Sequence, residues 1–540
     1  VFVEIVSWND PRKAPEGKIT KILGTPGDNN AEMHAIAMEK GFDSELPHKV
    51  EEEARKIKGA GIQKSDYENR RDMRGVLTFT IDPKDAKDFD DAISFKETEG
   101  GLYEIGVHIA DVSHYVRPGS LLDEEARNRG TSVYLVDRTI PMLPEILSND
   151  LCSLVPNQDR LTMSAIFIMD KNAKVKNEWF GRTIIHSKKR FTYEEAEEHI
   201  KKPSAPLHKE LGILNALAKK LTRERFAQGA IALDQEEVRF VLDEKGTPLK
   251  VEIKERGDSN RLIEEFMLLA NKKVAEVLSP KKSRRPEGSG SRPQASGKED
   301  AHVSIYRVHD YPSKEKMADL AAFLRSLGLK APLVGGIIPS RELNKLLENL
   351  SGKDTMADTV HRAIIRSMAK AVYSTKNIGH YGLAFEYYTH FTSPIRRYPD
   401  ILVHRLLINK LAGREIPANQ LLEYEKMSLV ASEQEKRAQD AERASIKYKQ
   451  VEYMSVRRGE RFEGIISGIT EWGLYVEEIT TKCEGMVRVR DMNDDFYIFD
   501  EKKLLFFGQK TKKTYRLGDR VRIKVKAADL ERKVIDYALE

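Results

Sequence analysis

Five aspartates gather in the stretch TIDPKDAKDFDDA, residues 80–92. Aspartate is disfavoured inside helices and strands, so this segment is predicted to be a loop that follows an apolar strand over residues 75–81. Two carboxylates held about 4 Å apart repel each other by about 4 kcal/mol at an effective dielectric constant of about 20. A folded protein therefore keeps such a cluster where a cation neutralises it or where the side chains spread into water.

The residue types in this loop indicate a site for hard divalent cations. Oxygen-only ligands select Mg²⁺ or Mn²⁺ over zinc. Two such ions can activate a water molecule and stabilise the leaving oxygen when a phosphodiester is hydrolysed. The alternatives are a solvated acidic turn and a Ca²⁺ loop. The apolar neighbours Ile81, Phe89, Ala92 and Ile93 favour a buried site, and the EF-hand spacing is absent.

The composition is that of a multidomain globular protein. At roughly 150 residues per domain, the length of 540 residues suggests about three or four domains. The 90 basic and 85 acidic residues give a net charge of +5, which does not by itself indicate a nucleic-acid partner. Cys152 and Cys483 are far apart, which excludes a disulfide framework and argues against a thiolate zinc site. A reducing, cytoplasmic location is therefore expected.

Four segments are expected along the chain. Residues 1–28 contain two strands, and we interpret them as the tail of a β-barrel cut from a larger protein, because the chain starts without Met in a strand-like pattern. Residues 29–70 are expected to be a helical connector, residues 71–455 the main domain, and residues 456–540 a small barrel of about five strands. Residues 280–300 are rich in basic residues, Gly, Ser and Pro, which predicts a flexible surface loop.

Periodicity and turn residues predict the main elements of the large domain. Hairpins are expected around Gly100-Gly101 and around residues 244–246. Apolar residues at helical spacing predict helices over residues 207–228, 261–278, 356–375, 394–411 and 418–456.

A second motif, HFTSPIRRYPD, occupies residues 390–400. Pro394 suits the first turn of a helix capped by Thr392 or Ser393. Arg396 and Arg397 would then lie near a helix N-terminus, where backbone N–H groups already favour a phosphate. The alternative is a pair of surface arginines.

The two motifs resemble those of the ribonuclease II/R exoribonucleases, the RNB family. The resemblance implies that Asp82, Asp88, Asp90 and Asp91 hold Mg²⁺, with Mn²⁺ as a substitute. It also implies that Asp90 is the aspartate essential for cleavage and that Arg396 contacts the scissile phosphate. The Arg-Arg-Tyr-Pro-Asp ending is more similar to the ribonuclease R branch than to the ribonuclease II branch.

The resemblance further implies RNA contacts outside the acidic loop. Tyr134 and Phe240 match a base clamp, although each would otherwise be a core aromatic, Phe240 especially because it lies in an alternating strand. Arg397 is expected to bind RNA. Glu442 matches a glutamate that contacts the substrate, and Glu435 is an alternative on the same predicted helix.

The terminal segments resemble OB-type barrels. Residues 456–540 are similar to an S-one-type RNA-binding fold, in which Trp472, Tyr475 and Arg488 would face RNA. Residues 1–28 resemble the end of a cold-shock domain. The expected fold is therefore a multidomain α/β protein, with a mixed α+β RNB catalytic domain flanked by OB-fold β-barrels.

These features predict a processive 3′–5′ exoribonuclease that hydrolyses single-stranded RNA to nucleoside 5′-monophosphates, with the RNA 3′ end in a channel. The resemblance implies a monomer and contact with the ribosome or the RNA-decay machinery. The alternatives are a non-catalytic OB-fold RNA-binding protein with a degenerate nuclease domain and a metal-dependent DNA nuclease. No residue identifies a contact to the RNA 2′-hydroxyl.

Overall fold

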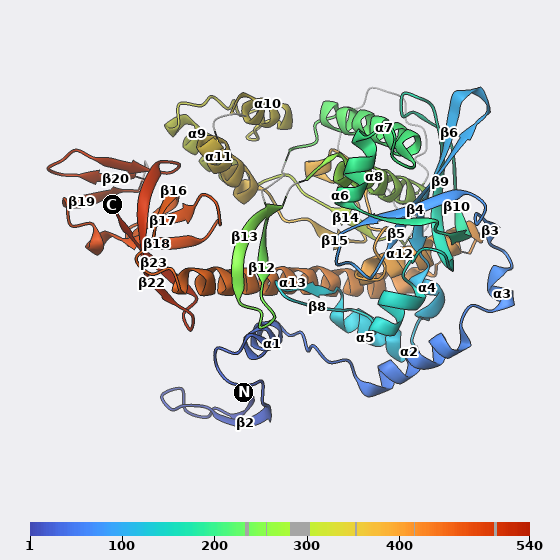
Figure 1. The fold of residues 1–540 in the computed structure, drawn as a ribbon, viewed down its shortest axis with the longest axis horizontal. Helices are drawn as coiled ribbons and strands as arrows, with labels where there is room; N and C mark the ends of the chain where they lie inside the picture. Colours follow the sequence, from blue (N-terminus) through green and yellow to red (C-terminus); the bar gives the residue numbers. More distant parts are fainter. Residues whose placement is uncertain (233–236, 255, 281–302, 351–353, 415, 502–504) are drawn as a thin grey trace.

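The computed structural model describes residues 1–232, 237–254, 256–280, 303–350, 354–414, 416–501 and 505–540. A mixed α/β domain makes up most of the molecule, and a small β-barrel lies at the far end of a long helix (Figure 1). The largest hydrophobic core belongs to the mixed domain, and a separate core fills the barrel. The predicted loop at residues 280–300 falls almost wholly outside the described residues.

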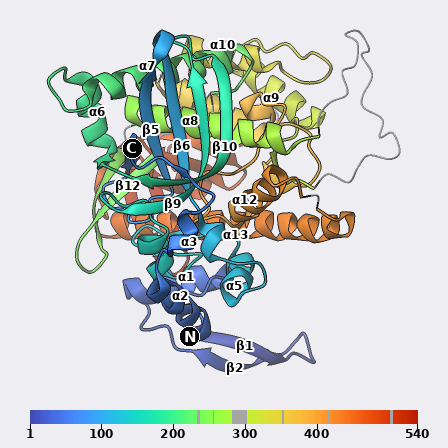
Figure 2. The same cartoon turned by 90° about the vertical axis from the view of Figure 1, so that its right-hand side faces the viewer.

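A seven-stranded sheet forms the centre of the mixed domain, in the order β11-β4-β5-β6-β9-β10-β3. The expected hairpin at Gly100-Gly101 connects β5 to β6. Helices α7, α8 and α12 contribute to the same core as the sheet, and Figure 2 shows β5, β6 and β10 in front of α8. The strands and helices are β3 (Arg71–Asp72), β4 (Leu77–Asp82), β5 (Asp91–Thr98), β6 (Leu102–Ala110), β9 (Asp159–Met169), β10 (Val175–His186), β11 (Lys189–Thr192), α7 (His208–Ala227), α8 (Asp258–Leu278) and α12 (Tyr398–Leu411).

The acidic loop joins two neighbouring strands of this sheet. It leaves the end of β4 at Asp82 and enters β5 at Asp91, so both ends of the loop lie at one edge of the sheet. Strand β11 runs parallel to β4 and pairs Thr192 with Asp82. Residues of the loop and of the segment that follows β11 therefore lie close together, at the same end of these neighbouring strands.

Two of the predicted helices have different bounds in the structure. The helix expected over residues 356–375 ends early: α11 (Asp354–Ser367) is followed by β15 (Val372–Ser374), which pairs with β14 (Tyr306–Val308). The helix expected over residues 394–411 begins only at Tyr398, so Pro399 rather than Pro394 occupies its first turn. Residues before Tyr398 are not helical because the backbone of Arg397 pairs with Thr131.

The long helix predicted over residues 418–456 is confirmed as α13 (Leu421–Ser455). Its last turns enter the barrel core through Val451 and Met454. The barrel closes in the order β16-β17-β18-β23-β22, which confirms the prediction of about five strands, and it carries an inserted three-stranded sheet that was not predicted. The strands are β16 (Arg461–Thr470), β17 (Gly473–Glu478), β18 (Glu484–Arg488), β22 (Arg520–Asp529) and β23 (Val534–Leu539), with β19 (Tyr497–Asp500), β20 (Leu505–Gly508) and β21 (Thr514–Arg516) inserted.

Two separate hairpins lie beside the main body. The predicted one around residues 244–246 consists of β12 (Glu237–Leu242) and β13 (Pro248–Lys254), and it crosses α13 (Figure 1). The N-terminal hairpin pairs β1 (Phe2–Ser7) with β2 (Glu16–Lys21) and is followed by α1 (Asn29–Glu39), α2 (His48–Ala60) and α3 (Lys64–Tyr67). Within the described ranges, none of the helices combines the length and apolar character needed to cross a bilayer.

Candidate active site

The four predicted aspartates lie together at the edge of the sheet. Asp82 and Asp90 are buried, whereas Asp88 and Asp91 are half-buried. Asp85, which was not in the predicted set, is exposed. The loop is buried at its two ends, where Ile81, Phe89, Ala92 and Ile93 belong to the main core, whereas residues 83–85 and 87 are exposed.

Burial and mutual repulsion raise the pKa values of these carboxyl groups. Burial raises the pKa of Asp82 to about 8, and the charges of Asp91 and Asp88 add to the effect. Burial raises the pKa of Asp91 to about 6, although Arg396 and Arg397 act in the opposite direction. The pKa values of Asp88 and Asp90 are also raised, again chiefly by burial. A bound cation would favour the charged form of all four groups.

The donor set fits a hard divalent ion. The Oδ2 atom of Asp82 is buried and has no hydrogen-bond partner, which leaves an oxygen free to coordinate. Within the described part of the chain, no three His, Cys, Asp or Glu side chains converge tightly enough to enclose an ion as they stand. Mg²⁺ is commonly held by one or two carboxylates and keeps several waters. The aspartates therefore suit an ion that is bound by part of the set and by water.

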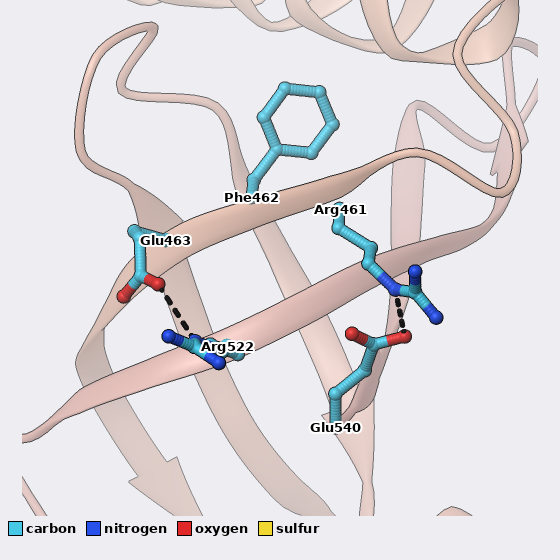
Figure 3. Close-up of a pocket in the computed structure, with 5 residues that line it drawn as sticks. All are labelled: Arg461, Phe462, Glu463, Arg522 and Glu540. Atoms are coloured by element: carbon cyan, nitrogen blue, oxygen red, sulfur yellow. Dashed lines mark hydrogen bonds and ion pairs between the residues drawn. The ribbon is translucent and has the colours of Figure 1, made fainter.

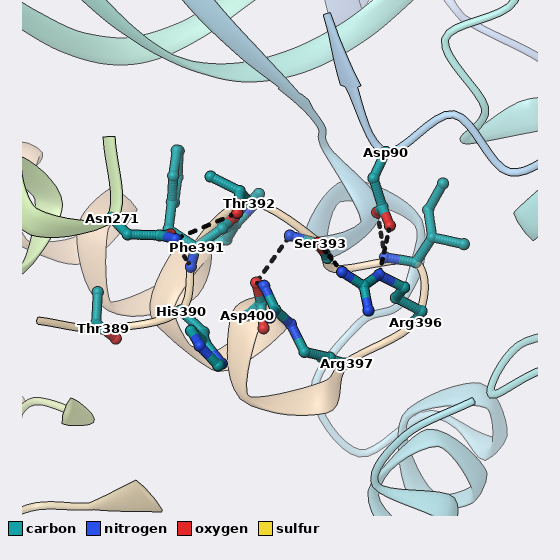
Figure 4. A network of polar contacts seen from close by, with 12 residues as sticks. Asp90, Asn271, Thr389, His390, Phe391, Thr392, Ser393, Arg396, Arg397 and Asp400 are labelled. Atoms are coloured by element: carbon teal, nitrogen blue, oxygen red, sulfur yellow. Dashed lines mark hydrogen bonds and ion pairs between the residues drawn. The ribbon is translucent and has the colours of Figure 1, made fainter. Parts of the chain in front are cut away.

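Asp90 connects the acidic loop to the second motif (Figure 4). Its Oδ1 atom accepts a hydrogen bond of 2.8 Å from the backbone N–H of Ile395, 305 residues away in the sequence. The Nε atom of Arg396 lies 3.7 Å from Oδ2 of the same carboxylate. The structure thus brings together the two residues that were predicted to be catalytic, Asp90 and Arg396.

The two neighbouring arginines are in different environments. The side chain of Arg396 is 41% exposed and can reach a ligand. The side chain of Arg397 is only 15% exposed and donates to Oδ1 of Asp400 at 2.8 Å. Burial disfavours the charged form of Arg397, but the Asp400 carboxylate more than offsets this and raises the guanidinium pKa. Arg397 is therefore half-buried and paired within the protein in this structure, and its contact with RNA stays a prediction.

Tyr134 lies near Asp90 and Arg396. The residue is 37% exposed, and burial together with the charges of Asp88 and Asp90 raises its hydroxyl pKa, whereas Arg396 acts in the opposite direction. The strand that carries it, β7 (Val133–Tyr134), follows Ser132, whose N–H donates to the carbonyl of Arg396 at 2.9 Å. The ring is therefore well placed to contact a substrate at this site.

The other predicted RNA contacts in the main domain are less open. Phe240, on β12, is only 7% exposed, as expected for a core aromatic in an alternating strand. Its ring has no open face for a base in this structure, so stacking would require the hairpin to move. Glu442 is exposed on α13, and burial together with the nearby Glu237 of the same hairpin raises its pKa.

The predicted barrel residues are accessible to different degrees. Trp472 is 69% exposed and Tyr475 is at the border of exposure, so both rings can contact a ligand. Arg488 pairs with Asp536 at 3.1 Å, which directs its charge to a carboxylate of the barrel.

On another part of the barrel, a pocket of about 400 Å³ contains two arginines that are also paired (Figure 3). These pairs are Arg461–Glu540 at 2.6 Å and Arg522–Glu463 at 3.1 Å.

Two residues at the acidic loop were not found from the sequence. The charges of Asp91 and Asp82, after burial, raise the hydroxyl pKa of Tyr193, which begins α6 (Tyr193–Lys201). Arg190 donates from Nη2 to the carbonyl of Lys84 at 2.9 Å and so holds the loop backbone. The parallel pairing of β11 with β4 brings Arg190 and Tyr193 to the acidic loop. This pairing cannot be predicted from the local sequence pattern.

Known proteins match both the sequence and the fold. A model of the RNB domain matches residues 70–413, a cold shock domain model residues 1–47, and an S1 RNA binding domain model residues 455–539. Ribonuclease R of Thermotoga maritima is 39% identical over 556 residues, covering 100% of this chain and 74% of that protein. Ribonuclease R of Escherichia coli K12 is 34% identical over 559 residues, covering 100% of this chain and 66% of that protein.

Solved structures agree with this relationship. Mycoplasma genitalium RNase R in complex with ribose methylated single-stranded RNA superimposes with a TM-score of 0.88 at 28% identity, covering 97% of this chain and 80% of that one. Yeast Ssd1, a pseudonuclease, matches with a TM-score of 0.73 at 20% identity over 93% of this chain and 61% of that one, which shows a shared fold alone. The chain therefore belongs to the RNB family and is a 3′–5′ exoribonuclease of the ribonuclease R type.

Proposed function

We propose that this exoribonuclease degrades single-stranded RNA processively from its 3′ end and releases nucleoside 5′-monophosphates. One observation carries the proposal: the Asp90 carboxylate, fixed by the Ile395 N–H at 2.8 Å, lies beside Arg396 at the end of an acidic loop that begins at Asp82, whose buried oxygen has no partner. This arrangement combines ligands for hard cations with a fixed positive charge, which is what phosphodiester hydrolysis requires.

Mg²⁺ is the proposed cofactor, with Mn²⁺ as a substitute, and Asp82, Asp88, Asp90 and Asp91 are its proposed ligands. When bound, the ion supplies a Lewis acid and a more acidic water molecule at neutral pH. The chain's own residues position the RNA around it. The exposed guanidinium of Arg396 binds the scissile phosphate and stabilises the negative charge that develops there.

Aromatic and charged side chains are proposed to guide the RNA. Tyr134 stacks on a base next to the scissile bond, because its partly exposed ring lies beside Arg396. Trp472 and Tyr475 provide exposed rings on the barrel for bases farther from the 3′ end. The relatives support RNA as the partner, since M. genitalium RNase R has been solved with single-stranded and with double-stranded RNA. Glu442 is proposed to contact the RNA backbone near the hairpin.

A gel assay tests this proposal. A 5′-labelled single-stranded RNA is incubated with the chain and Mg²⁺, with or without a chelator. The expected result is conversion of the full-length RNA to a short 5′-labelled end product with few intermediates, and this conversion should stop when the chelator is present. An excess of unlabelled RNA, added after the reaction starts, should not prevent RNA that is already bound from reaching the end product if degradation is processive.

Two other outcomes of this assay would support a different function for the chain. Intact RNA in both lanes together with a shifted band on a native gel would support a non-catalytic RNA-binding protein. Equal degradation of a DNA oligomer of the same sequence would support a nuclease that does not distinguish RNA from DNA. Either result contradicts the proposed function.

A further inference from the structure

The guanidinium group of Arg396 rests on the side chain of Ser393. The Nη2 atom of Arg396 donates to the Ser393 hydroxyl oxygen at 3.1 Å (Figure 4). Ser393 is buried, whereas Arg396 is partly exposed, so the contact holds the charged group from its inner side. The exposed part of the Arg396 side chain remains accessible to a phosphate.

Asp400 in turn fixes the backbone of Ser393. Its Oδ1 atom accepts the backbone N–H of Ser393 at 2.8 Å and a guanidinium N–H of Arg397 at the same distance. Asp400 is completely buried in the first turn of α12, and its other oxygen has no hydrogen-bond partner. Burying a charged pair is a poor way to gain stability, since desolvation offsets much of the attraction. A geometric role accounts better for this buried pair.

The turn between these residues is held at both ends. Ile395 donates its N–H to Asp90, and the backbone N–H of Phe391 donates to Oδ1 of Asn271 on α8 at 2.8 Å. The carbonyl of Phe391 also contacts Nε2 of His404 on α12 at 2.8 Å. The turn is therefore attached to the acidic loop and to two helices of the core. The backbone that carries Arg396 has little freedom to move.

We propose that Ser393 and Asp400 are positioning residues that set the guanidinium of Arg396 before the substrate binds. The proposal rests on the proposed role of Arg396 at the scissile phosphate. A long arginine side chain loses conformational freedom when it is ordered, and a group that is ordered in advance stabilises the transition state without that loss. The Ser393 hydroxyl supplies this order, and Asp400 keeps the hydroxyl in place.

Substitution of Ser393 tests the proposal directly. In Ser393→Ala, kcat for 5′-labelled single-stranded RNA with Mg²⁺ is expected to fall about tenfold, equivalent to ~1.4 kcal/mol, while KM and Tm stay close to those of the parent chain. Ser393→Thr retains a hydroxyl and should restore most of the lost kcat. Ser428→Ala is the matched control, because Ser428 is also buried and its hydroxyl donates within helix α13.

A double-mutant cycle separates positioning from a general structural effect. If Ser393 acts through Arg396, Ser393→Ala should have no further effect on kcat in an Arg396→Ala background. Additive losses of kcat, or a parent-like kcat in Ser393→Ala, would overturn the inference. Asp400→Asn offers a second variant, which should lower kcat in the same way and also lose its effect when Arg396 is absent.

The cycle also distinguishes this inference from the proposed function. An impaired Arg396→Ala beside a fully active Ser393→Ala leaves the proposed function standing and rejects the positioning role. A fully active Arg396→Ala contradicts the proposed role of Arg396 itself, and the positioning role is rejected with it.

Discussion

Arg396 and Arg397 show how strongly the surroundings determine what a single residue does. Both are arginines of one motif, but Arg396 projects toward the acidic loop, whereas Arg397 is buried against Asp400. At this scale, two predictions separate catalytic side chains from structural ones.

Asp90→Asn is expected to abolish cleavage and to leave RNA binding intact. The substitution keeps an oxygen that can accept the Ile395 N–H but removes the negative charge needed at the site. We expect the rate of cleavage to fall at least about 100-fold, as measured with labelled RNA, with an unchanged dissociation constant. Asp85→Asn, in the same loop but exposed, should cleave at the parent rate. An active Asp90→Asn chain would show that another carboxylate is the essential one.

Arg397→Ala is expected to destabilise the fold, whereas Arg396→Ala is expected to reduce activity. Removing Arg397 leaves the Asp400 carboxylate buried without its cation, which costs about 3–5 kcal/mol of unfolding free energy. Removing the partly exposed Arg396 should leave stability nearly unchanged and lower kcat about 10²–10³-fold. Urea denaturation and RNA cleavage, measured on both variants, check this pair. Equal stability losses in the two variants would contradict the assignment.

At the scale of elements, a buried histidine on one strand forms hydrogen bonds with both neighbouring strands of the sheet. His108 on β6 contacts the Ser94 hydroxyl of β5 at 2.8 Å through Nε2 and the Ser164 hydroxyl of β9 at 2.7 Å through Nδ1. Burial, and to a lesser extent Arg71, lowers the pKa of His108 to about 3. The imidazole is therefore neutral in the folded protein throughout the neutral and mildly acidic range.

This shift predicts how stability depends on pH. Because the pKa is near 6.5 in the unfolded chain and about 3 in the folded one, the unfolded chain binds one more proton between these values. As the pH falls from about 6.5 toward about 3, protonation of His108 in the unfolded chain should thus lower the unfolding free energy by about 1.4 kcal/mol per pH unit. Urea denaturation at several pH values measures the slope. A His108→Gln variant with the same slope as the parent would show that His108 does not contribute.

At the scale of the whole molecule, the acidic loop makes the folded chain responsive to divalent ions. Burial raises the pKa values of four carboxyl groups there, and a bound cation would favour their charged forms. Mg²⁺ at one hundred times its dissociation constant should stabilise the fold by about 2.7 kcal/mol, and chelation should remove this gain. Thermal denaturation with and without Mg²⁺ measures the effect. Asp82→Asn should show a smaller shift, and an equal shift in both chains would place the ion elsewhere.

Much of the architecture could be predicted because it depends on local patterns. The alternating residues of β12 and β13, the helical spacing of α8 and α13, and the short strands of the barrel all report their own conformation. Helix bounds were less predictable. The segment after Ser367 has helical character but becomes β15, because β14 offers its edge to pair with, and a pairing between distant segments leaves no local pattern.

The sequence by itself determined the acidic loop, since five aspartates, four of them the predicted ligands, lie within ten residues between the end of one strand and the start of the next. It also determined the presence of the arginine motif. Only the tertiary structure decided which arginine meets Asp90, that Phe240 is buried, and that Tyr193 and Arg190 join the loop. Each of these depends on contacts between residues far apart in the chain, and such contacts are selected by packing and strand pairing rather than by local residue preference.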